Sequence, residues 1–111
     1  MILDNMPVIK TSLTKNDLQE RKLSKAEVDG KSIVTTKIGD NFYAMDSICS
    51  HEGGPLEEGT LENYALVCPW HQGTFDIRTA KASPNTDWVT DLKSYTVIVD
   101  EASGEISVET G

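Results

Sequence analysis

Two short units in the middle of the chain contain all of its cysteines and histidines. The first unit is Cys49-Ser50-His51, and the second, after sixteen intervening residues, is Cys68-Pro69-Trp70-His71. Thiolate and imidazole groups are the ligands that soft and borderline metal ions prefer. If the two units lie on loop tips that face each other, four such ligands meet at one place. The pattern therefore predicts one metal centre that uses both units.

Residue types alone leave other chemistry open for the same side chains. A disulfide between Cys49 and Cys68 is chemically possible, although a reducing compartment disfavours it. A cysteine–histidine nucleophile pair would need only one of the two units. A zinc site with two cysteines and two histidines would use both, but the spacing differs from that of the common zinc fingers. Two unrelated buried cysteines with two surface histidines are disfavoured by the tight pairing.

The residues around the two units favour one family. The pattern C-x-H-x16-C-x-x-H resembles the Rieske [2Fe–2S] motif, in which two cysteines bind one iron and two histidines bind the other. Segments 41–56 and 68–76 both resemble bacterial Rieske ferredoxins, and the similarity covers nearly the whole chain. The resemblance implies one [2Fe–2S] cluster. Its implied ligands are Cys49 and Cys68 on one iron, and His51 and His71 on the other.

The resemblance also implies an electron carrier rather than an enzyme. A Rieske ferredoxin would pass single electrons from an NAD(P)H-dependent flavoprotein reductase to a terminal oxygenase, as in ring-hydroxylating dioxygenase systems. The chain is too short to hold the mononuclear iron site of such an oxygenase as well. Two alternatives stay open: the small subunit of an assimilatory nitrite reductase, which shares the expected fold, and a zinc-stabilised interaction domain.

Departures from the high-potential members of the family imply a low reduction potential. Those proteins join the two cluster loops by a disulfide, whose cysteines would fall at Gly54 and Trp70 here. They also donate serine and tyrosine hydroxyls to cluster sulfurs, at positions that are Gly73 and Phe75 in this chain. Hydrogen bonds to sulfur favour the reduced cluster, so we expect a potential near the low end of about −150 to +300 mV. A further departure is Gln72, where the family often has glycine.

Glycine and proline crowd the loops that carry the two units. Backbone N–H groups of glycine-rich loops can approach negatively charged sulfur closely. Gly53 and Gly54 are placed either for that role or as simple turn residues.

Short β-strands must hold these loops. Runs rich in Val, Ile and Thr alternate with turn dipeptides such as Asp29-Gly30 and Gly39-Asp40, which is typical of an all-β domain. We expect strands over 21–28, 32–38, 41–46, 95–100 and 105–109, and one or two helical turns near 14–18. A hairpin that turns at Gly59-Thr60 should lead into the second unit. The resemblance implies antiparallel sheets in a sandwich or partial barrel, as a single domain over 1–111 with a smaller cluster-binding subdomain inserted at about 46–86.

Composition and charge narrow the function classes. The 111 residues suffice for one domain, and 38% hydrophobic with 25% charged residues is ordinary for a globular protein. Ten Lys and Arg residues against 18 Asp and Glu residues leave a net charge of −8, which disfavours nucleic-acid and membrane-surface roles and favours a basic protein partner. No apolar run approaches the roughly 20 residues of a membrane span, and polar residues interrupt any signal peptide, so we expect a cytoplasmic protein.

Overall fold

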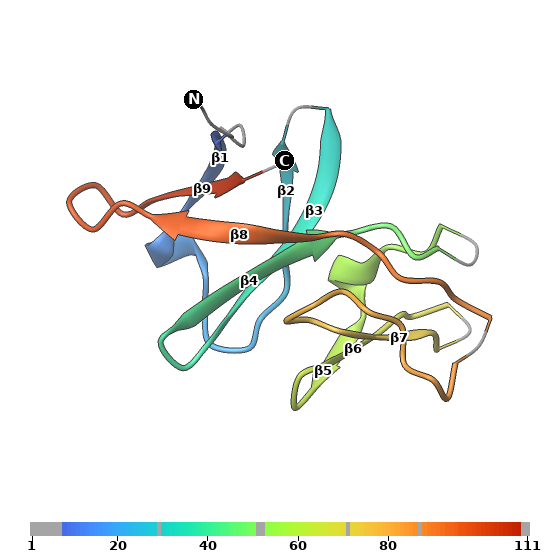
Figure 1. The fold of residues 1–111 in the computed structure, drawn as a ribbon. Helices are drawn as coiled ribbons and strands as arrows, with labels where there is room; N and C mark the ends of the chain where they lie inside the picture. Colours follow the sequence, from blue (N-terminus) through green and yellow to red (C-terminus); the bar gives the residue numbers. More distant parts are fainter. Residues whose placement is uncertain (1–7, 29, 51–52, 71, 87, 110–111) are drawn as a thin grey trace, which may run out of the picture.

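Nine β-strands and two short 3₁₀ helices form the part of the chain that the structure describes (Figure 1). The structure is a computed structural model, and it describes residues 8–28, 30–50, 53–70, 72–86 and 88–109. The elements are β1 (Val8–Thr14), η1 (Lys15–Asp17), β2 (Ser24–Val28), β3 (Lys31–Ile38), β4 (Asn41–Asp46), η2 (Leu56–Glu58), β5 (Thr60–Glu62), β6 (Ala65–Val67), β7 (Thr74–Asp76), β8 (Ser94–Val99) and β9 (Glu105–Glu109). Neither helix is long and apolar enough to cross a membrane.

The larger of two sheets has the strand order β1-β9-β8-β4-β3-β2, and every neighbouring pair in it is antiparallel. The two end strands, β1 and β2, also lie against each other, so the sheet nearly closes on itself (Figure 1). Four successive residues of β3, from Ile33 to Thr36, are buried, because this strand has protein on both of its faces. The all-β fold with a partial barrel is thus confirmed.

The smaller sheet, β5-β6-β7, is formed entirely by the segment between β4 and β8. It lies at one end of the molecule, in the lower right of Figure 1. Leu66 and Phe75 are paired across β6 and β7, and both are fully buried. They pack in one core with Val34 and Met45 of the larger sheet. A separate core fills the partial barrel, so two hydrophobic cores share the strands β3 and β4.

Several expected elements appear where the sequence pattern places them. The strands over 41–46 and 105–109 match the expected bounds, and Ile106 and Val108 of β9 are both fully buried. The predicted helical turn is η1, where the Asp17 carboxylate accepts hydrogen bonds from the Thr14 backbone N–H and hydroxyl, at 2.8 and 3.2 Å.

Two expectations about local structure were wrong. The strand expected from residue 21 begins only at Ser24, because Arg21 has a φ of +60°, which is incompatible with a strand. The hairpin turns at Asn63-Tyr64 rather than at Gly59-Thr60. Gly59 instead ends η2 beside the carbonyl oxygen of Val67, where the Cβ of any other residue would collide.

Candidate metal centre

The two cysteines meet although they are nineteen positions apart in the chain. Cys49 follows the end of β4, Cys68 follows the end of β6, and their exposed fractions are 3% and 1%. Burial, together with a hydrogen bond and charge from the neighbouring Cys49 thiol, raises the pKa of the Cys68 thiol to about 11. The structure therefore brings the two predicted sulfur ligands together. The predicted ligands His51 and His71 lie outside the described residues.

The loop after Cys49 closes on itself through its own backbone. The Cys49 N–H donates to the carbonyl of Gly54 at 2.9 Å, and the Gly53 N–H donates to the carbonyl of Cys49 at 3.1 Å. Gly53 has a φ of +76°, a conformation that favours glycine. The Gly53 amide thus donates within the loop and not to a cysteine sulfur. Gly53 has the role of a simple turn residue, which was one of the two roles expected for it.

A different backbone amide reaches a cysteine sulfur. The Trp70 N–H donates to Sγ of Cys68 at 3.4 Å, while the Cys68 N–H donates to the carbonyl of Gly73 at 2.7 Å. Pro69, between the two, has a fixed φ and no N–H of its own, which favours a tight turn in which the next amide points back. The Cys-Pro-Trp order could have predicted this donor. It lowers the pKa of the Cys68 thiol, opposite to the effect of burial, because it favours the thiolate.

Gly54 lets the first loop approach the second. A Cβ at this position would lie 2.6 Å from Sγ of Cys68 and 3.3 Å from Cβ of Trp70. Real Cβ atoms do not approach sulfur so closely, so a side chain at position 54 of this chain would force the Cys68 sulfur or the loops to shift. In a disulfide the two Cβ atoms lie about 3.8 Å apart. Positions 54 and 70 are therefore close enough for the disulfide that the high-potential members of the family are expected to have there. This chain has no cysteine at either position.

These features fit a group with sulfur ligands. Two buried thiols face each other, one of them already accepts a backbone N–H, and Gly54 leaves the space beside it free of a side chain. Leu56, fully buried in the same core, excludes water from the protein side. Anionic sulfur needs donors and a dry, shaped surrounding, and both are present in the described part of the two loops.

Comparison with known families decides between the readings of the two cysteines. Residues 9–96 match the Rieske [2Fe-2S] domain family, which accounts for most of the chain. The chain is a member of the Rieske family. Its cofactor is accordingly one Rieske-type [2Fe–2S] cluster, and the zinc and disulfide readings of the cysteine pair are set aside.

Similar proteins are ferredoxins. The ferredoxin component of the naphthalene 1,2-dioxygenase/salicylate 5-hydroxylase systems of a Ralstonia species is 32% identical over 94 residues, covering 85% of this chain and 89% of that one. The ferredoxin of carbazole 1,9a-dioxygenase from Nocardioides aromaticivorans IC177 has a TM-score of 0.82 and 29% identity, with 93% of this chain and 98% of that chain covered. A complex of reduced oxygenase and oxidized ferredoxin in carbazole 1,9a-dioxygenase gives a TM-score of 0.79 and 28% identity, with coverage of 95% and 94%. This Rieske protein is therefore an electron carrier of the ferredoxin type and not itself an enzyme.

The unusual Gln72 of this Rieske protein has a structural explanation. Its φ is +60°, in the left-handed region that glycine adopts without strain. The glycine common in the family at this position is therefore suited to the same backbone path. Gln72 follows that path at a cost of roughly 1 kcal/mol.

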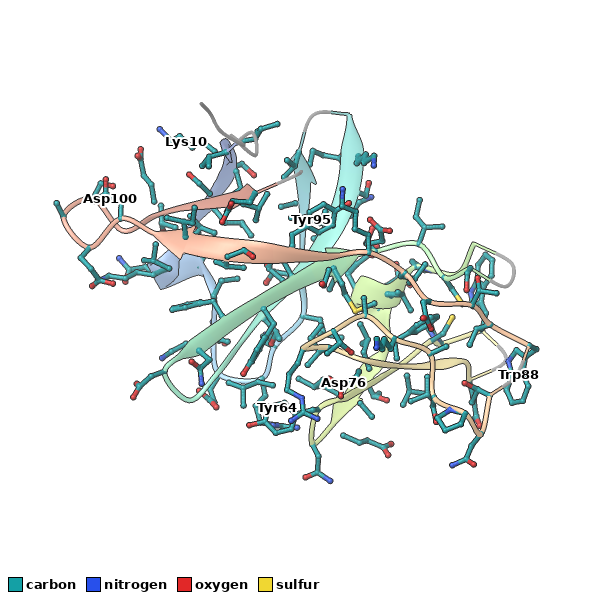
Figure 2. All side chains as sticks on the ribbon, viewed as in Figure 1. Lys10, Tyr64, Asp76, Trp88, Tyr95 and Asp100 are labelled. Carbon is teal, nitrogen blue, oxygen red and sulfur yellow. The ribbon has the colours of Figure 1, made fainter. Side chains whose placement is uncertain are left out.

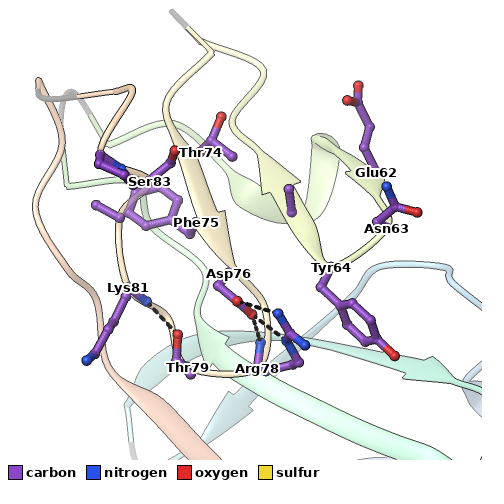
Figure 3. Close-up of a pocket in the computed structure, with 13 residues that line it drawn as sticks. Glu62, Asn63, Tyr64, Thr74, Phe75, Asp76, Arg78, Thr79, Lys81 and Ser83 are labelled. Carbon is purple, nitrogen blue, oxygen red and sulfur yellow. Dashed lines mark hydrogen bonds and ion pairs between the residues drawn. The ribbon is translucent and has the colours of Figure 1, made fainter.

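The smaller sheet of this Rieske protein also carries a hollow of about 710 Å³ that neither cysteine lines (Figure 3). It lies between the β5–β6 turn, β7 and the segment 78–84. Arg78 forms a two-point ion pair with the Asp76 carboxylate at 2.8 and 3.0 Å, and these hydrogen bonds lower the pKa of Asp76. The same guanidinium lies 4.1 Å above the ring of Tyr64, which packs edge-on against Tyr43 of β4 at 6.2 Å. The stack of Arg78, Tyr64 and Tyr43 joins the two sheets. Its one signal in the sequence is an aspartate two positions before an arginine, which could have predicted the ion pair.

Proposed function

We propose that this Rieske protein passes single electrons from an NAD(P)H-dependent flavoprotein reductase to a terminal oxygenase. The pair of buried cysteines on two converging loops is the observation that carries the proposal. The similar ferredoxin components, and the ferredoxin–oxygenase complex to which the fold corresponds, support an oxygenase as the acceptor. A cytoplasmic setting belongs to the proposal, because reducing conditions there keep thiols free of disulfides.

Four residues would hold the cluster. Cys49 and Cys68 would bind one iron, and His51 and His71 would bind the other. The bound cluster supplies one reversible electron-accepting site. The chain's own contribution is to bury both sulfur atoms, to donate the Trp70 N–H to one of them, and to exclude water with the packed core around Leu56.

Three exposed apolar side chains surround the cysteine pair and offer a surface for partners. Ile48, Trp70 and Trp88 have exposed fractions of 55%, 48% and 43%. Ile48 directly precedes Cys49, Trp70 lies two residues after Cys68, and Trp88 precedes Val89 of the core that contains both cysteines. Trp88 lies at the outer edge of the molecule in Figure 2. Large apolar side chains gathered on an exposed end of a protein are typical of a docking surface.

Charge indicates what kind of partner docks there. Residues 39–75, which include both cysteine loops, β5 and β6, contain six acidic residues and no lysine or arginine. A redox partner should therefore present basic residues around an apolar centre. Such complementarity accelerates association more than it tightens the complex, which suits a carrier that must dissociate after each electron.

The buried cysteine pair favours this function over the two alternatives from the sequence. A nitrite reductase small subunit that acts only as a binding module has no need of two facing thiols beneath exposed tryptophans. A zinc-stabilised interaction domain would need four protein ligands on one metal ion, whereas a Rieske cluster divides them between two.

The test begins with the purified protein. We expect a red-brown protein with about two irons and two acid-labile sulfides per chain, and a dithionite-reduced electron paramagnetic resonance spectrum whose average g value lies below that of the free electron. Cys49→Ser, Cys68→Ser, His51→Ala and His71→Ala should each abolish that spectrum, while Ser32→Ala should not. A colourless protein with one zinc would overturn the cluster assignment. The proposed role would be overturned if the cluster is intact but accepts no electrons from a flavoprotein reductase. It would also be overturned if the reduced protein passes no electrons to a Rieske oxygenase.

A further inference from the structure

The two cysteine loops have few direct links between them. Each closes through its own backbone, by Cys49 to Gly54 in one and by Cys68 to Gly73 in the other. Between the described residues of 47–54 and 68–73 no backbone–backbone hydrogen bond crosses from one loop to the other, and no disulfide joins them. The thiols of Cys49 and Cys68 interact directly, by a side-chain hydrogen bond. The contact of Gly54 with Cys68 and Trp70 only packs them together. Something else must hold the loops in register.

The side chain of Ser50 ties the first loop to a third segment, residues 83–90. Its hydroxyl donates to the Thr90 carbonyl at 2.8 Å and accepts from the Thr90 N–H at 2.9 Å. One hydroxyl thus satisfies both backbone groups of a residue forty positions away. Ser50 is the residue directly after Cys49, so this contact acts on the cysteine itself through a single peptide unit.

The same third segment is fastened to the second loop at its other end. The Thr74 N–H donates to Oγ1 of Thr86 at 3.3 Å, and the Thr86 hydroxyl donates to the carbonyl of Ser83 at 3.2 Å. Val89, almost completely buried, lies so close to Gly73 that a Cβ there would be 2.6 Å from the valine Cγ1. Residues 83–90 therefore contact both cysteine loops, whereas the loops hardly bond to each other.

We propose that Ser50 and Thr86 are positioning residues that hold the two cysteine loops in register through segment 83–90, in place of a covalent link. The Ser50 hydroxyl binds Thr90 at the end of the segment, and the Thr86 hydroxyl, within the segment, accepts from Thr74, which follows the second loop. The inference rests on the proposed cluster ligands for its effect on the cluster, but the hydroxyl contacts themselves are independent of the cluster.

The first test removes one hydroxyl. In Ser50→Ala holoprotein, hydrogen–deuterium exchange at the peptide covering Thr90 should accelerate about tenfold, since the amide loses its acceptor. Cluster loss in the presence of an iron chelator should accelerate by a similar factor, and the resonance lines of the reduced cluster should broaden. Ser50→Thr keeps a hydroxyl at the same place and should restore all three values. Ser32→Ala is the matched control, because Ser32 also donates an exposed side-chain hydrogen bond, to Glu27 at 2.7 Å, but lies in β3.

The second test asks whether the two ends act together. Thr86→Val removes the other hydroxyl with little change of volume, and Thr86→Ser retains it. If the segment is one connecting unit, the double variant Ser50→Ala/Thr86→Val should lose its cluster little faster than the more affected single variant. Strictly multiplicative rates would overturn the shared role, and Ser50→Ala with unchanged Thr90 exchange would overturn the contact. An effect of Ser32→Ala as large as that of Ser50→Ala would also overturn it.

Discussion

At the scale of single residues, Gly54 is required by the space beside Cys68 and not by backbone conformation. Gly54→Ala places a methyl group where Sγ of Cys68 lies 2.6 Å away, so the loops must separate. We expect a loss of about 1–3 kcal/mol in unfolding free energy and less than half of the normal iron content, by urea denaturation and iron analysis. Gly39→Ala is the opposite control, because Gly39 has a φ of +63° with open space around it. It should lose stability through strain yet keep its iron, and equal iron loss in both variants would contradict the steric explanation.

The reduction potential should respond to a single hydroxyl at Phe75. This ring is fully buried in the core that contains both cysteines, at a position where high-potential relatives are expected to have tyrosine. A hydrogen bond to sulfur worth about 1–2 kcal/mol more in the reduced state corresponds to roughly 40–90 mV for one electron. We therefore expect Phe75→Tyr to raise the midpoint potential by that amount in a redox titration.

Two comparisons sharpen that measurement. Phe42→Tyr makes the same chemical change outside the cysteine-containing core and should leave the potential unchanged. Gly73→Ser, the other hydroxyl that high-potential relatives would supply, is a poorer test, because its Cβ would meet Val89 at 2.6 Å. A lower or unchanged midpoint in Phe75→Tyr, with full iron content, would argue against the electrostatic explanation.

At the scale of secondary-structure elements, the junction of β4 and β8 depends on Tyr95. Its hydroxyl donates to Oδ1 of Asp46 at 2.6 Å, and burial together with this carboxylate raises its pKa. Above the unfolded-state pKa of about 10, the unfolded chain releases a proton that the folded chain retains, so stability falls as the pH rises. Wild-type protein should lose about 1.4 kcal/mol per pH unit more than Tyr95→Phe between pH 10 and 12 in urea titrations. Parallel curves for the two proteins would show that Tyr95 ionises normally when folded.

At the scale of the whole molecule, residues 39–75, which include both cysteine loops, have six acidic residues and no basic ones. Replacing Glu57 and Glu58 near the first cysteine loop by glutamine should slow reduction by a flavoprotein reductase about two- to fivefold at low ionic strength, with little effect at high salt. Glu101→Gln/Glu105→Gln removes the same charge beside the β8–β9 turn, at the opposite end of the molecule in Figure 1, and should change the rate far less. Stopped-flow rates over a salt series measure both. Equal slowing by the two pairs would mean that only net charge matters.

Much of this fold can be predicted from local patterns, and the errors have identifiable causes. The turn dipeptide Gly39-Asp40 before β4 and the alternation of β9 locate these strands correctly, and the alternate residues Ile106 and Val108 of β9 are fully buried. The hairpin turn was misplaced because Gly59 resembles a turn residue but is needed for its close approach to Val67. Nothing local distinguishes these two reasons for a glycine. Arg21 likewise adopts its positive φ where its guanidinium donates to the Asn63 carbonyl at 2.7 Å, a contact across 42 positions.

Residue types and their spacing were enough to identify the family and the candidate ligands, because ligand chemistry depends on both and both can be read directly from the chain. Only the tertiary structure decided that Trp70, and not Gly53, directs its amide at sulfur. It alone showed that Gly54 lets the two loops approach each other and that Ser50 joins Cys49 to a third segment. Such contacts link residues many positions apart, and they form only when the burial of two cores draws the loops together, so no local pattern encodes them.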